Sequence, residues 1–403
     1  MRKSKLWMVP CLVLPVLAGC GGTSSANEVV IKIWEDESNI ETVKALANDF
    51  ITSYKKVYHD APDIVLEFTA KSEKVAIEEM GTVSESGEGP DIAAVTHDTI
   101  ASGVDLKLVA PVAFSEEMKS RMTEEALNAV TYNETIYGYP ITAESMTVMY
   151  DKTQISAAEL VSFEALKASG KKIGLQLTGD NGGYYTYGLY TDSVLFGEDG
   201  KDPETVNIAT SKSIENVTNF YSSYLDCFED ASPEVALNYV TANRIAGVIT
   251  TPFLLNSMKE ALGNKLAIAK LPTLGGEELR PFSGYKAYVV SRYSKNGAIA
   301  QALCEYLTNY DSQAVRLIDK GYLPASPLDA TQDFIDAMDA SEEAKVFADS
   351  LKLSTVMPNI PEMSRFWSPM NSASTNFIRE NSSLTKETVQ SVLKEVTNTI
   401  LNK

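Results

Sequence analysis

Strand-like and helix-like segments alternate from residue 29 to residue 95, and this alternation restricts the possible folds more than any other feature. Val29–Trp34 is almost continuous in apolar residues, as strands buried in parallel sheets are. Apolar residues at helical spacing follow from Ile40 to Tyr54, and strand-like runs return at Ile64–Phe68 and Ile92–Val95. The pattern predicts an α/β lobe built on a parallel, doubly wound sheet.

Two loops of this lobe are candidate binding segments. In open parallel sheets, ligands collect where strands end in loops. Glu35–Asn39 follows the first predicted strand, and Thr96–Asp98 follows the third. We therefore expect both loops to face a ligand.

The first nineteen residues have the pattern of a secretion signal. Three basic residues precede the apolar run Leu6–Leu17, which is too short to span a membrane. The segment Leu17-Ala18-Gly19-Cys20 resembles the bacterial lipobox, in which the cysteine becomes a lipidated N-terminus. An ordinary secretory signal with an incidental cysteine is the alternative. Residues 21–27 then read as a flexible tether.

Charge and side-chain chemistry exclude several classes of partner. The net charge is −19, and removal of residues 1–19, which carry three positive charges and no acids, makes it −22. Nucleic acids and anionic membranes bind clustered Lys and Arg, so neither is expected as a partner. Cys227 and Cys304 lie in apolar helical patterns and are predicted to be buried free thiols. With His59 and His97 the only histidines, and no cysteine pairs at metal spacing, we expect neither a zinc site nor a cofactor.

Glu144 stands out because it interrupts an apolar, β-rich run. The segment Thr131–Lys152 reads TYNETIYGYPITAESMTVMYDK and is predicted to contain strands. A buried carboxylate is costly unless it is hydrogen-bonded. Glu144 is therefore either a ligand-binding acceptor or a surface residue at a strand end.

A second lobe begins near residue 172 and carries a tyrosine cluster. Lys172–Leu177 is a predicted strand, Thr178–Gly183 is a turn-rich loop, and three tyrosines fall within Tyr184–Tyr187. The tyrosines have three possible roles: stacking on a ligand, packing within a helix, or binding ferric ion. The last would use His97 and Glu144 as further ligands, as in ferric-ion receptors.

The length of the chain favours two domains with several crossings between them. A short strand ends at Thr251-Pro252-Phe253, Lys286–Val290 fits a return to the first lobe, and Tyr322–Pro327 is a candidate third crossing. The predicted division is a signal at 1–19, a tether at 20–28, an N-terminal lobe at 29–142 and 273–320, and a C-terminal lobe at 143–272 and 321–403.

The stretch Met357–Trp367, MPNIPEMSRFW, contains two prolines three residues apart. They remove backbone donors that a helix or central strand needs, so the stretch is predicted to be a fixed-shape connection that enters a helix near Ser364. Trp367 is then either a core residue or a flat face offered to a ligand.

This stretch resembles the C-terminal signature of the bacterial maltose/maltodextrin-binding proteins, the solute receptors of ABC importers. Further matches are Tyr137–Pro140, Glu144 and Met149–Lys152, and the resemblance spans Val29–Lys403. It implies a two-lobe periplasmic-binding-protein-like α/β fold of type II, hinged by three crossings, with no catalysis and no cofactor. It also implies a monomer that is anchored by lipid on the extracellular face of the cell membrane and delivers malto-oligosaccharides to membrane permease subunits.

The resemblance implies roles for individual residues. Asp98, Glu144 and Asp36 would accept hydrogen bonds from sugar hydroxyls, and stacking faces would come from Tyr184, Tyr187, Phe253 and Trp367. The sequence departs from the family at several positions. The family has a tryptophan where Val95 and Phe253 stand, and an alanine and an arginine in place of Thr96 and Thr99. Gly182–Gly183 replace an acidic residue. These departures predict a preference for longer malto-oligosaccharides over maltose.

A glycoside hydrolase is the competing class of function, because it also binds sugars with aromatic rings and carboxylates. It would need two carboxyl groups roughly 5–10 Å apart across a glycosidic bond. Asp98 and Glu144 are the candidates for that pair.

Overall fold

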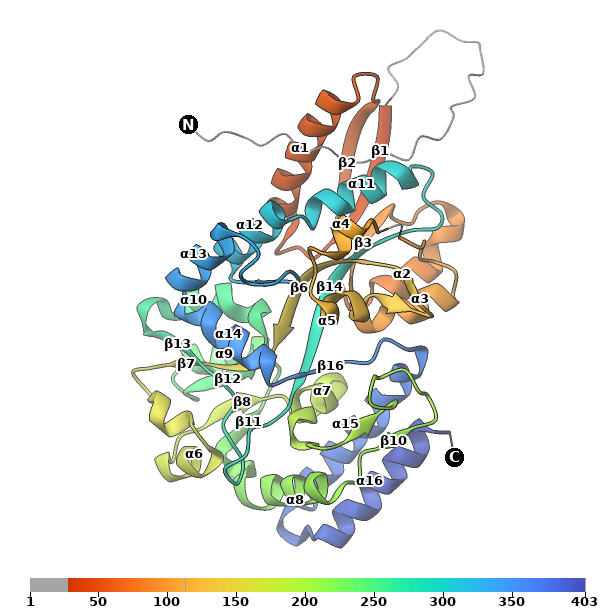
Figure 1. Ribbon diagram of the computed structural model, residues 1–403. Coiled ribbons are helices and arrows are strands. Elements are labelled where there is room, and N and C mark those ends of the chain that lie inside the picture. Colours follow the sequence, from red (N-terminus) through yellow and green to blue (C-terminus); the bar gives the residue numbers. More distant parts are fainter. Residues whose placement is uncertain (1–27, 113, 403) are drawn as a thin grey trace.

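The computed structural model describes residues 28–112 and 114–402, so Cys20, the predicted signal and the predicted tether up to residue 27 lie outside the described residues. Glu28, predicted to be the last tether residue, is instead the first residue of a strand. The chain forms an N-terminal and a C-terminal lobe, one above the other in Figure 1. Within the described ranges, no helix is long and apolar enough to cross a membrane.

The N-terminal lobe is built on a seven-stranded sheet with the order β15-β6-β14-β3-β1-β2, and β16 pairs with β14. As predicted, β1 runs parallel to β2 and β3. The strands β14 and β6 are antiparallel additions that the alternating pattern did not predict. The strands are β1 (Glu28–Glu35), β2 (Asp63–Ala70), β3 (Ile92–Thr96), β6 (Tyr139–Ser145), β14 (Phe282–Val290), β15 (Leu323–Pro324) and β16 (Thr355–Val356).

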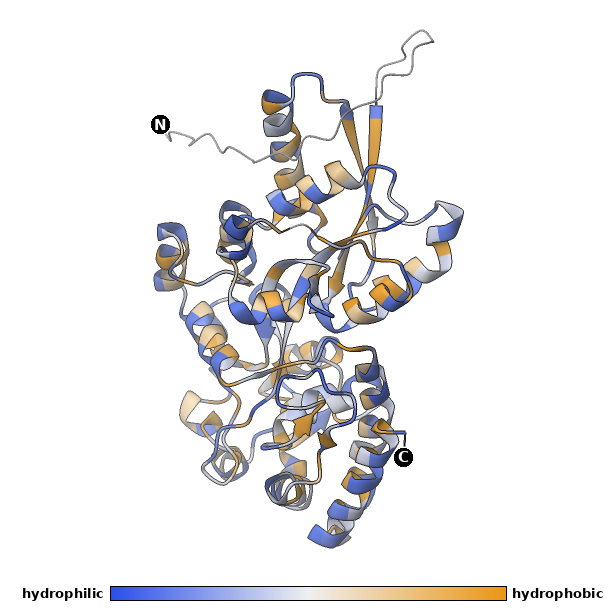
Figure 2. Ribbon diagram, turned by 45° about the vertical axis from the view of Figure 1, so that its right-hand side comes forward, coloured by the Kyte–Doolittle hydropathy of each residue, from blue (hydrophilic) through white to orange (hydrophobic). Residues whose placement is uncertain are grey.

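Helices cover this sheet because each presents an apolar stripe to it. In α1 (Ile40–Val57), Val43, Leu46 and Phe50 recur at helical spacing and are buried. They pack with strand residues such as Ile31 and with Leu303 of α11 (Gly297–Leu307) in one core cluster. Figure 2 shows apolar residues along the strands beneath the helices, with hydrophilic residues on the outer faces.

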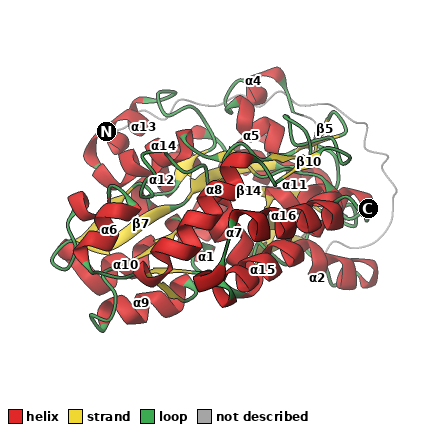
Figure 3. Cartoon of the chain, turned by 90° about the horizontal axis from the view of Figure 1, so that it is seen from below, coloured by secondary structure: helices red, strands yellow, loops and turns green. Residues whose placement is uncertain are grey.

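The C-terminal lobe has a five-stranded sheet with the order β11-β8-β12-β7-β13. Its strands are β7 (Thr147–Asp151), β8 (Ile173–Leu175), β11 (Phe228–Asp230), β12 (Gly247–Thr250) and β13 (Leu266–Ala269). A large aromatic core joins the sheet to α8 (Ser211–Asn219), α15 (Ser364–Arg379) and α16 (Lys386–Ile400), which lie next to one another when the molecule is seen from below (Figure 3). Helix α16 begins at the N-cap Thr385, whose side chain accepts a hydrogen bond from the amide of Thr388.

The lobes are joined where strands leave one sheet for the other. The chain crosses first at Met146, between β6 and β7. It returns along β14, which runs from the lower lobe into the upper one (Figure 1). Leu274, Leu279 and Phe282 still pack in the core of the C-terminal lobe, so the chain returns later than the predicted boundary at residue 273.

The third connection also differs from the prediction in detail. Helix α12 (Tyr310–Lys320) was assigned to the N-terminal lobe, but its Ala314 and Leu317 pack with Leu255 of α10 (Leu255–Leu262) and with Phe334. Strand β15 then pairs with β6 before the chain enters α13 (Gln332–Ala340) and α14 (Glu342–Lys352). This region therefore lies against both lobes.

The remaining elements complete both lobes. Cys227 and Cys304 are free and buried, as the sequence predicted. The other helices are α2 (Ala76–Val83), α3 (Ile100–Asp105), α4 (Glu116–Lys119), α5 (Glu124–Ala129), α6 (Phe163–Ser169), α7 (Gly182–Thr186), α9 (Pro233–Thr241), α13 (Gln332–Ala340) and α14 (Glu342–Lys352); the small ribbons are β4 (Thr131–Tyr132) with β5 (Thr135–Ile136) and β9 (Val194–Leu195) with β10 (Val206–Asn207).

Candidate functional site

The proline-containing stretch MPNIPEMSRFW lies against both lobes. Helix α15 begins at Ser364, as predicted. Upstream of it, the Asn359 side chain accepts a hydrogen bond from the amide of Ala101 at 2.9 Å and donates one to the carbonyl of Ala129 at 3.0 Å. Both partners belong to the N-terminal lobe, whereas α15 packs in the C-terminal core. The stretch therefore fixes the start of α15 next to the junction between the lobes.

Trp367, on the first turn of α15, is neither fully buried nor free. Its ring meets Phe366 edge to face at 5.1 Å between centroids and Phe282 at 6.3 Å. Phe366 is fully buried, whereas Trp367 packs on the edge of the same core and keeps part of its surface exposed. Trp367 is thus held in a fixed orientation with surface left for a ligand.

The tyrosine cluster separates into two environments. Tyr187 is only 4% exposed, and its ring lies flat on Phe282. Its hydroxyl is 3.1 Å from the Ser193 hydroxyl. Tyr187 therefore belongs to the core, and its ring is not presented as a stacking face in this structure.

Tyr184 is only partly buried and lies among acidic groups of the other lobe. Burial raises the pKa of its hydroxyl, and the charge of Glu144, the neighbouring Tyr185 and the charge of Asp98 raise it further. Glu144 and Asp98 come from the N-terminal sheet and its loop, while Tyr184 is on α7 of the C-terminal lobe. The structure thus brings together three of the predicted site residues, one from the C-terminal lobe and two from the N-terminal lobe.

Glu144 occupies the end of β6, next to the first crossing. Burial raises the pKa of its carboxyl, Lys286 opposes this, Glu73 adds to it, and a hydrogen bond from the Thr251 side chain lowers it. Thr251 belongs to the C-terminal lobe and precedes Phe253, whose side chain is 36% exposed. The partners required by a half-buried carboxylate are therefore present.

His97 is not available as a metal ligand. Its Nδ1 accepts a hydrogen bond from the amide of Tyr285 at 3.1 Å, so the proton is on Nε2, which donates to the carbonyl of Met357 at 2.9 Å. Burial lowers the pKa of the ring. The ferric-ion interpretation loses one of its ligands, and the described part of the chain holds no cluster of three or more His, Cys, Asp or Glu suited to a metal.

Asp36 lies in the loop after β1, where its carboxylate accepts hydrogen bonds from the amide and the hydroxyl of Ser38. It also lies near Tyr322. Burial raises the pKa of the Tyr322 hydroxyl; Lys286 opposes this, and Glu144, Glu73 and Asp36 add to it. Asp36 therefore borders the same acidic region as Glu144.

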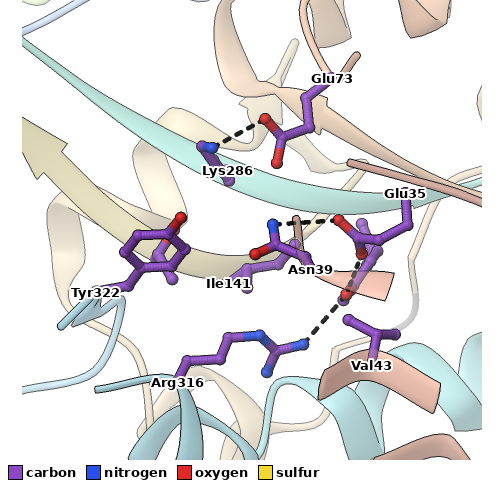
Figure 4. A pocket seen from close by; sticks show the side chains of 10 residues that line it. Glu35, Asn39, Val43, Glu73, Ile141, Lys286, Arg316 and Tyr322 are labelled. Atoms are coloured by element: carbon purple, nitrogen blue, oxygen red, sulfur yellow. Dashed lines mark hydrogen bonds and ion pairs between the residues drawn. The ribbon is translucent and has the colours of Figure 1, made fainter. Parts of the chain in front are cut away.

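Three residues of this region were missed by the sequence analysis: Glu73, Lys286 and Tyr322. They line a small hollow in the N-terminal lobe, together with Glu35, Asn39, Ile141 and Arg316 (Figure 4). Lys286 forms an ion pair with Glu73 at 2.9 Å, and its ammonium lies 5.8 Å from the centre of the Tyr322 ring. A lone lysine in the apolar strand FSGYKAYVV was a usable signal, since such a residue needs a partner.

A second polar chain lines the same hollow. The Tyr288 hydroxyl donates to Glu35 at 2.7 Å and accepts from Arg316 at 3.1 Å. Burial raises the pKa of Glu35 to about 7, Glu73 adds to this, and Tyr288 and Arg316 oppose it. Glu35 is fully enclosed and supports the loop that carries Asp36.

Two departures from the family pattern have a steric explanation. Val95 is completely buried beside Trp34 and offers no face to a ligand. At Gly182, a Cβ would lie 2.5 Å from the carbonyl oxygen of Leu177, and at Gly183 one would lie 2.8 Å from the Cβ of Met370. Because α7 packs so closely, no acidic side chain fits directly before Tyr184.

The arrangement suits an uncharged ligand that is rich in hydroxyl groups. The N-terminal lobe contributes carboxylates, from Glu144, Asp98, Asp36 and Glu73, and the C-terminal lobe contributes the partly exposed rings of Tyr184, Trp367 and Phe253. Carboxylates accept hydrogen bonds from hydroxyls, and aromatic faces pack on C–H surfaces.

Comparisons with known proteins agree with this description. A family model described as bacterial extracellular solute-binding protein matches residues 50–360. A galactooligosaccharide-binding protein of Bacillus subtilis is 26% identical over 401 residues, covering 92% of this chain and 91% of the relative. A maltooligosaccharide ABC transporter solute-binding lipoprotein of Streptococcus pneumoniae R6 is 25% identical over 342 residues, covering 79% of each chain.

Solved structures share the fold. The maltodextrin-binding protein MalE1 of L. casei BL23, without ligand, superposes with a TM-score of 0.78 at 20% identity, covering 93% of this chain and 99% of that one. An extracellular solute-binding protein of Staphylococcus aureus in complex with maltose superposes with a TM-score of 0.71 at 21% identity, covering 94% of this chain and 98% of that one. The two-lobe fold expected from the sequence is confirmed.

Proposed function

The chain belongs to the bacterial extracellular solute-binding proteins, and from that premise we propose that it is a receptor that binds malto-oligosaccharides between its lobes and delivers them to an ABC importer. The observation that carries the proposal is the proximity of Tyr184, from the C-terminal lobe, to the charges of Glu144 and Asp98 from the N-terminal lobe. A hinged receptor that closes on its ligand needs groups of this kind on both sides.

The choice of sugar is supported by the MPNIPEMSRFW signature and by relatives named for maltooligosaccharides and maltodextrin. The relative named for galactooligosaccharides supports a second candidate, a β-linked or α-linked galactose chain in the same site. Both candidates are neutral oligosaccharides, so the same carboxylates and rings would serve either.

Titration calorimetry with glucose, maltose, maltotriose, maltotetraose and a galactotetraose tests the proposal. Val95 and Phe253 remove aromatic area where the family has tryptophans, so maltose should bind about 1–2 kcal/mol more weakly than the longer chains. Equal or tighter binding of maltose would disprove the length preference. If galactotetraose binds more tightly than the malto-oligosaccharides, the proposed ligand is a galactose chain. If no sugar of the series binds, the sugar-receptor proposal is rejected.

The proposed receptor does not turn its ligand over. Membership of a family of binding proteins supports this, and a hydrolase would need one of its two carboxyl groups to act as an acid beside the scissile bond. The production of reducing ends during incubation with maltodextrin would be the direct contrary result.

We also propose that the protein is a monomer held at the extracellular face of the membrane by a lipid on Cys20, where it meets the permease subunits of its importer. The lipobox-like sequence before Cys20 and the lipoprotein relative of Streptococcus pneumoniae support the anchor. No nucleic acid, metal or cofactor has a part in this proposal.

A further inference from the structure

Lys286 is a cation close to two carboxylates, those of Glu73 and Glu144, at the hollow in the N-terminal lobe. Its ammonium pairs with Glu73 at 2.9 Å, and only 12% of its side chain and 9% of that of Glu73 are exposed. The other cation at the hollow, Arg316, is bonded to the carbonyls of Leu307 and Ser312 and to the hydroxyl of Tyr288. Lys286 is thus the cation placed to balance these carboxylates (Figure 4).

The strand register places Lys286 beside Glu144 as well. Lys286 of β14 lies opposite Thr142 of β6, and Gly284 lies opposite Glu144. Thr142 and Glu144 are two residues apart and lie on the same face of β6. Because Gly284 has no side chain, no bulky group on β14 stands directly opposite Glu144. The charge of Lys286 lowers the pKa of the Glu144 carboxyl, and the charge of Glu144 raises the pKa of the Lys286 ammonium, so each favours the charged form of the other.

We propose that Lys286 is a positioning residue that keeps Glu73 and Glu144 ionised and fixed as acceptors for ligand hydroxyls. It acts through these carboxylates, since its ammonium forms an ion pair with Glu73. The inference rests on the proposed function, because it assigns Glu73 and Glu144 the task of accepting hydroxyl groups.

The other groups around Glu144 cannot replace Lys286. Tyr184, Tyr185 and Tyr322 are neutral at physiological pH, and burial raises the pKa of each hydroxyl. Glu73 carries like charge, and Thr251 donates a single hydrogen bond to Glu144. Arg316 is engaged by Tyr288 and backbone carbonyls, and Glu35 adds a further carboxyl group near Glu73. Without Lys286, Glu73 and Glu144 would therefore have no cation beside them, and at least one would take up a proton. A protonated carboxyl loses part of its capacity to accept hydrogen bonds.

The first experiment needs no sugar. Melting temperatures of the wild type and of Lys286→Met are measured from pH 5 to pH 8. Loss of the cation raises the carboxyl pKa values in the folded state, so the stability of the variant is closest to wild type at pH 5 and falls behind as the pH rises. Lys286→Arg keeps the charge and should follow the wild-type curve in shape.

The second experiment measures affinity for maltotetraose over the same pH range. As the pH is lowered, both proteins should lose affinity, and Lys286→Met should do so first. The pH midpoint of this loss should be about one to three units higher in Lys286→Met than in the wild type. Glu73→Gln in the Lys286→Met background removes the like charge and should move the midpoint back downward. Lys352→Met is the matched control, because Lys352 forms an exposed ion pair with Asp349 at the same distance, 2.9 Å, on α14.

The outcomes separate this inference from the proposed function. A wild type that binds no sugar of the series rejects the proposed function, while the melting curves still decide whether Lys286 maintains the charge of the two acids. Parallel melting curves for wild type and Lys286→Met overturn the inference. The inference is also overturned if the wild type binds maltotetraose and Lys286→Met loses its affinity with the same pH midpoint as the wild type.

Discussion

The ring of Tyr187 lies face to face on the ring of Phe282, with 3.5 Å between centroids and 5° between planes. Phe282 begins β14, and Tyr184, Phe366 and Trp367 also contact its ring. One buried phenylalanine therefore orders the aromatic residues of the C-terminal lobe. Tyr187 and Phe366 lie on its buried side, whereas Tyr184 and Trp367 keep partly exposed surfaces.

Tyr187→Ala and Tyr184→Ala should have opposite consequences. Truncation of buried Tyr187 should cost about 3–5 kcal/mol of folding stability, as for other large core side chains. Tyr184→Ala should mainly weaken oligosaccharide binding. Urea unfolding and calorimetry with maltotetraose measure the two effects. A Tyr187→Ala variant that unfolds like the wild type but fails to bind would return Tyr187 to the binding site.

Trp367→Ala and its neighbour Phe366→Ala form a matched pair on α15. Loss of the partly exposed Trp367 ring should weaken maltotetraose binding by about 1 kcal/mol, or roughly five-fold, with a smaller loss of stability than for Phe366→Ala. Because Phe366 is fully buried, Phe366→Ala should lower the folding stability by about 3–5 kcal/mol. If Trp367→Ala lowers the melting temperature as much as Phe366→Ala and leaves affinity intact, Trp367 is a core residue.

Glu35 should make the protein less stable as the pH rises. Burial raises the pKa of its carboxyl from 4.5 to about 7. Because the folded-state pKa lies above the unfolded value, its stabilising contribution is complete below pH 4.5 and is lost as the pH rises to about 7. The loss amounts to about 3 kcal/mol at 1.36 kcal/mol per pKa unit. Urea unfolding at several pH values should show that Glu35→Gln removes this loss of stability with rising pH, whereas substitution of the exposed Glu41 on α1, Glu41→Gln, should not.

His97 should make the protein less stable as the pH falls, which is the opposite of the effect of Glu35. Burial lowers the pKa of its ring below 6.5, so its contribution to stability is complete above pH 6.5 and is lost as the pH falls further. Each unit of lowering is worth about 1.4 kcal/mol. The destabilisation caused by His97→Gln should therefore be larger at pH 8 than at pH 5. Exposed His59→Gln is the control, and a pH-independent cost of His97→Gln would contradict the neutral buried ring.

Cys20→Ala tests the proposed anchor. The variant should appear in the medium or remain unprocessed, because it lacks the thiol that carries the lipid. Fractionation of cells and medium, with Cys227→Ala as a control for loss of a thiol, gives the answer. A Cys20→Ala protein that stays on the membrane at the wild-type level would rule out lipidation at this position.

The sequence by itself determined the features that depend on neighbouring residues. Apolar spacing predicted the parallel arrangement of β1, β2 and β3, and the two prolines predicted a helix that begins at Ser364. Such signals are local, because periodicity and missing backbone donors act within a few residues. The receptor family was indicated by the resemblance of MPNIPEMSRFW to a known family signature, which is also confined to a short run of residues.

Only the tertiary structure decided which side of each element meets which partner. Tyr184 and Tyr187 are three residues apart on one short helical segment, yet Phe282 covers the ring of Tyr187 and leaves Tyr184 near Glu144. Glu73 is linked to the candidate site by its ion pair with Lys286, a residue distant from it in the sequence. These assignments depend on long-range packing, because a half-buried charge or ring takes its role from neighbours that the local pattern does not specify.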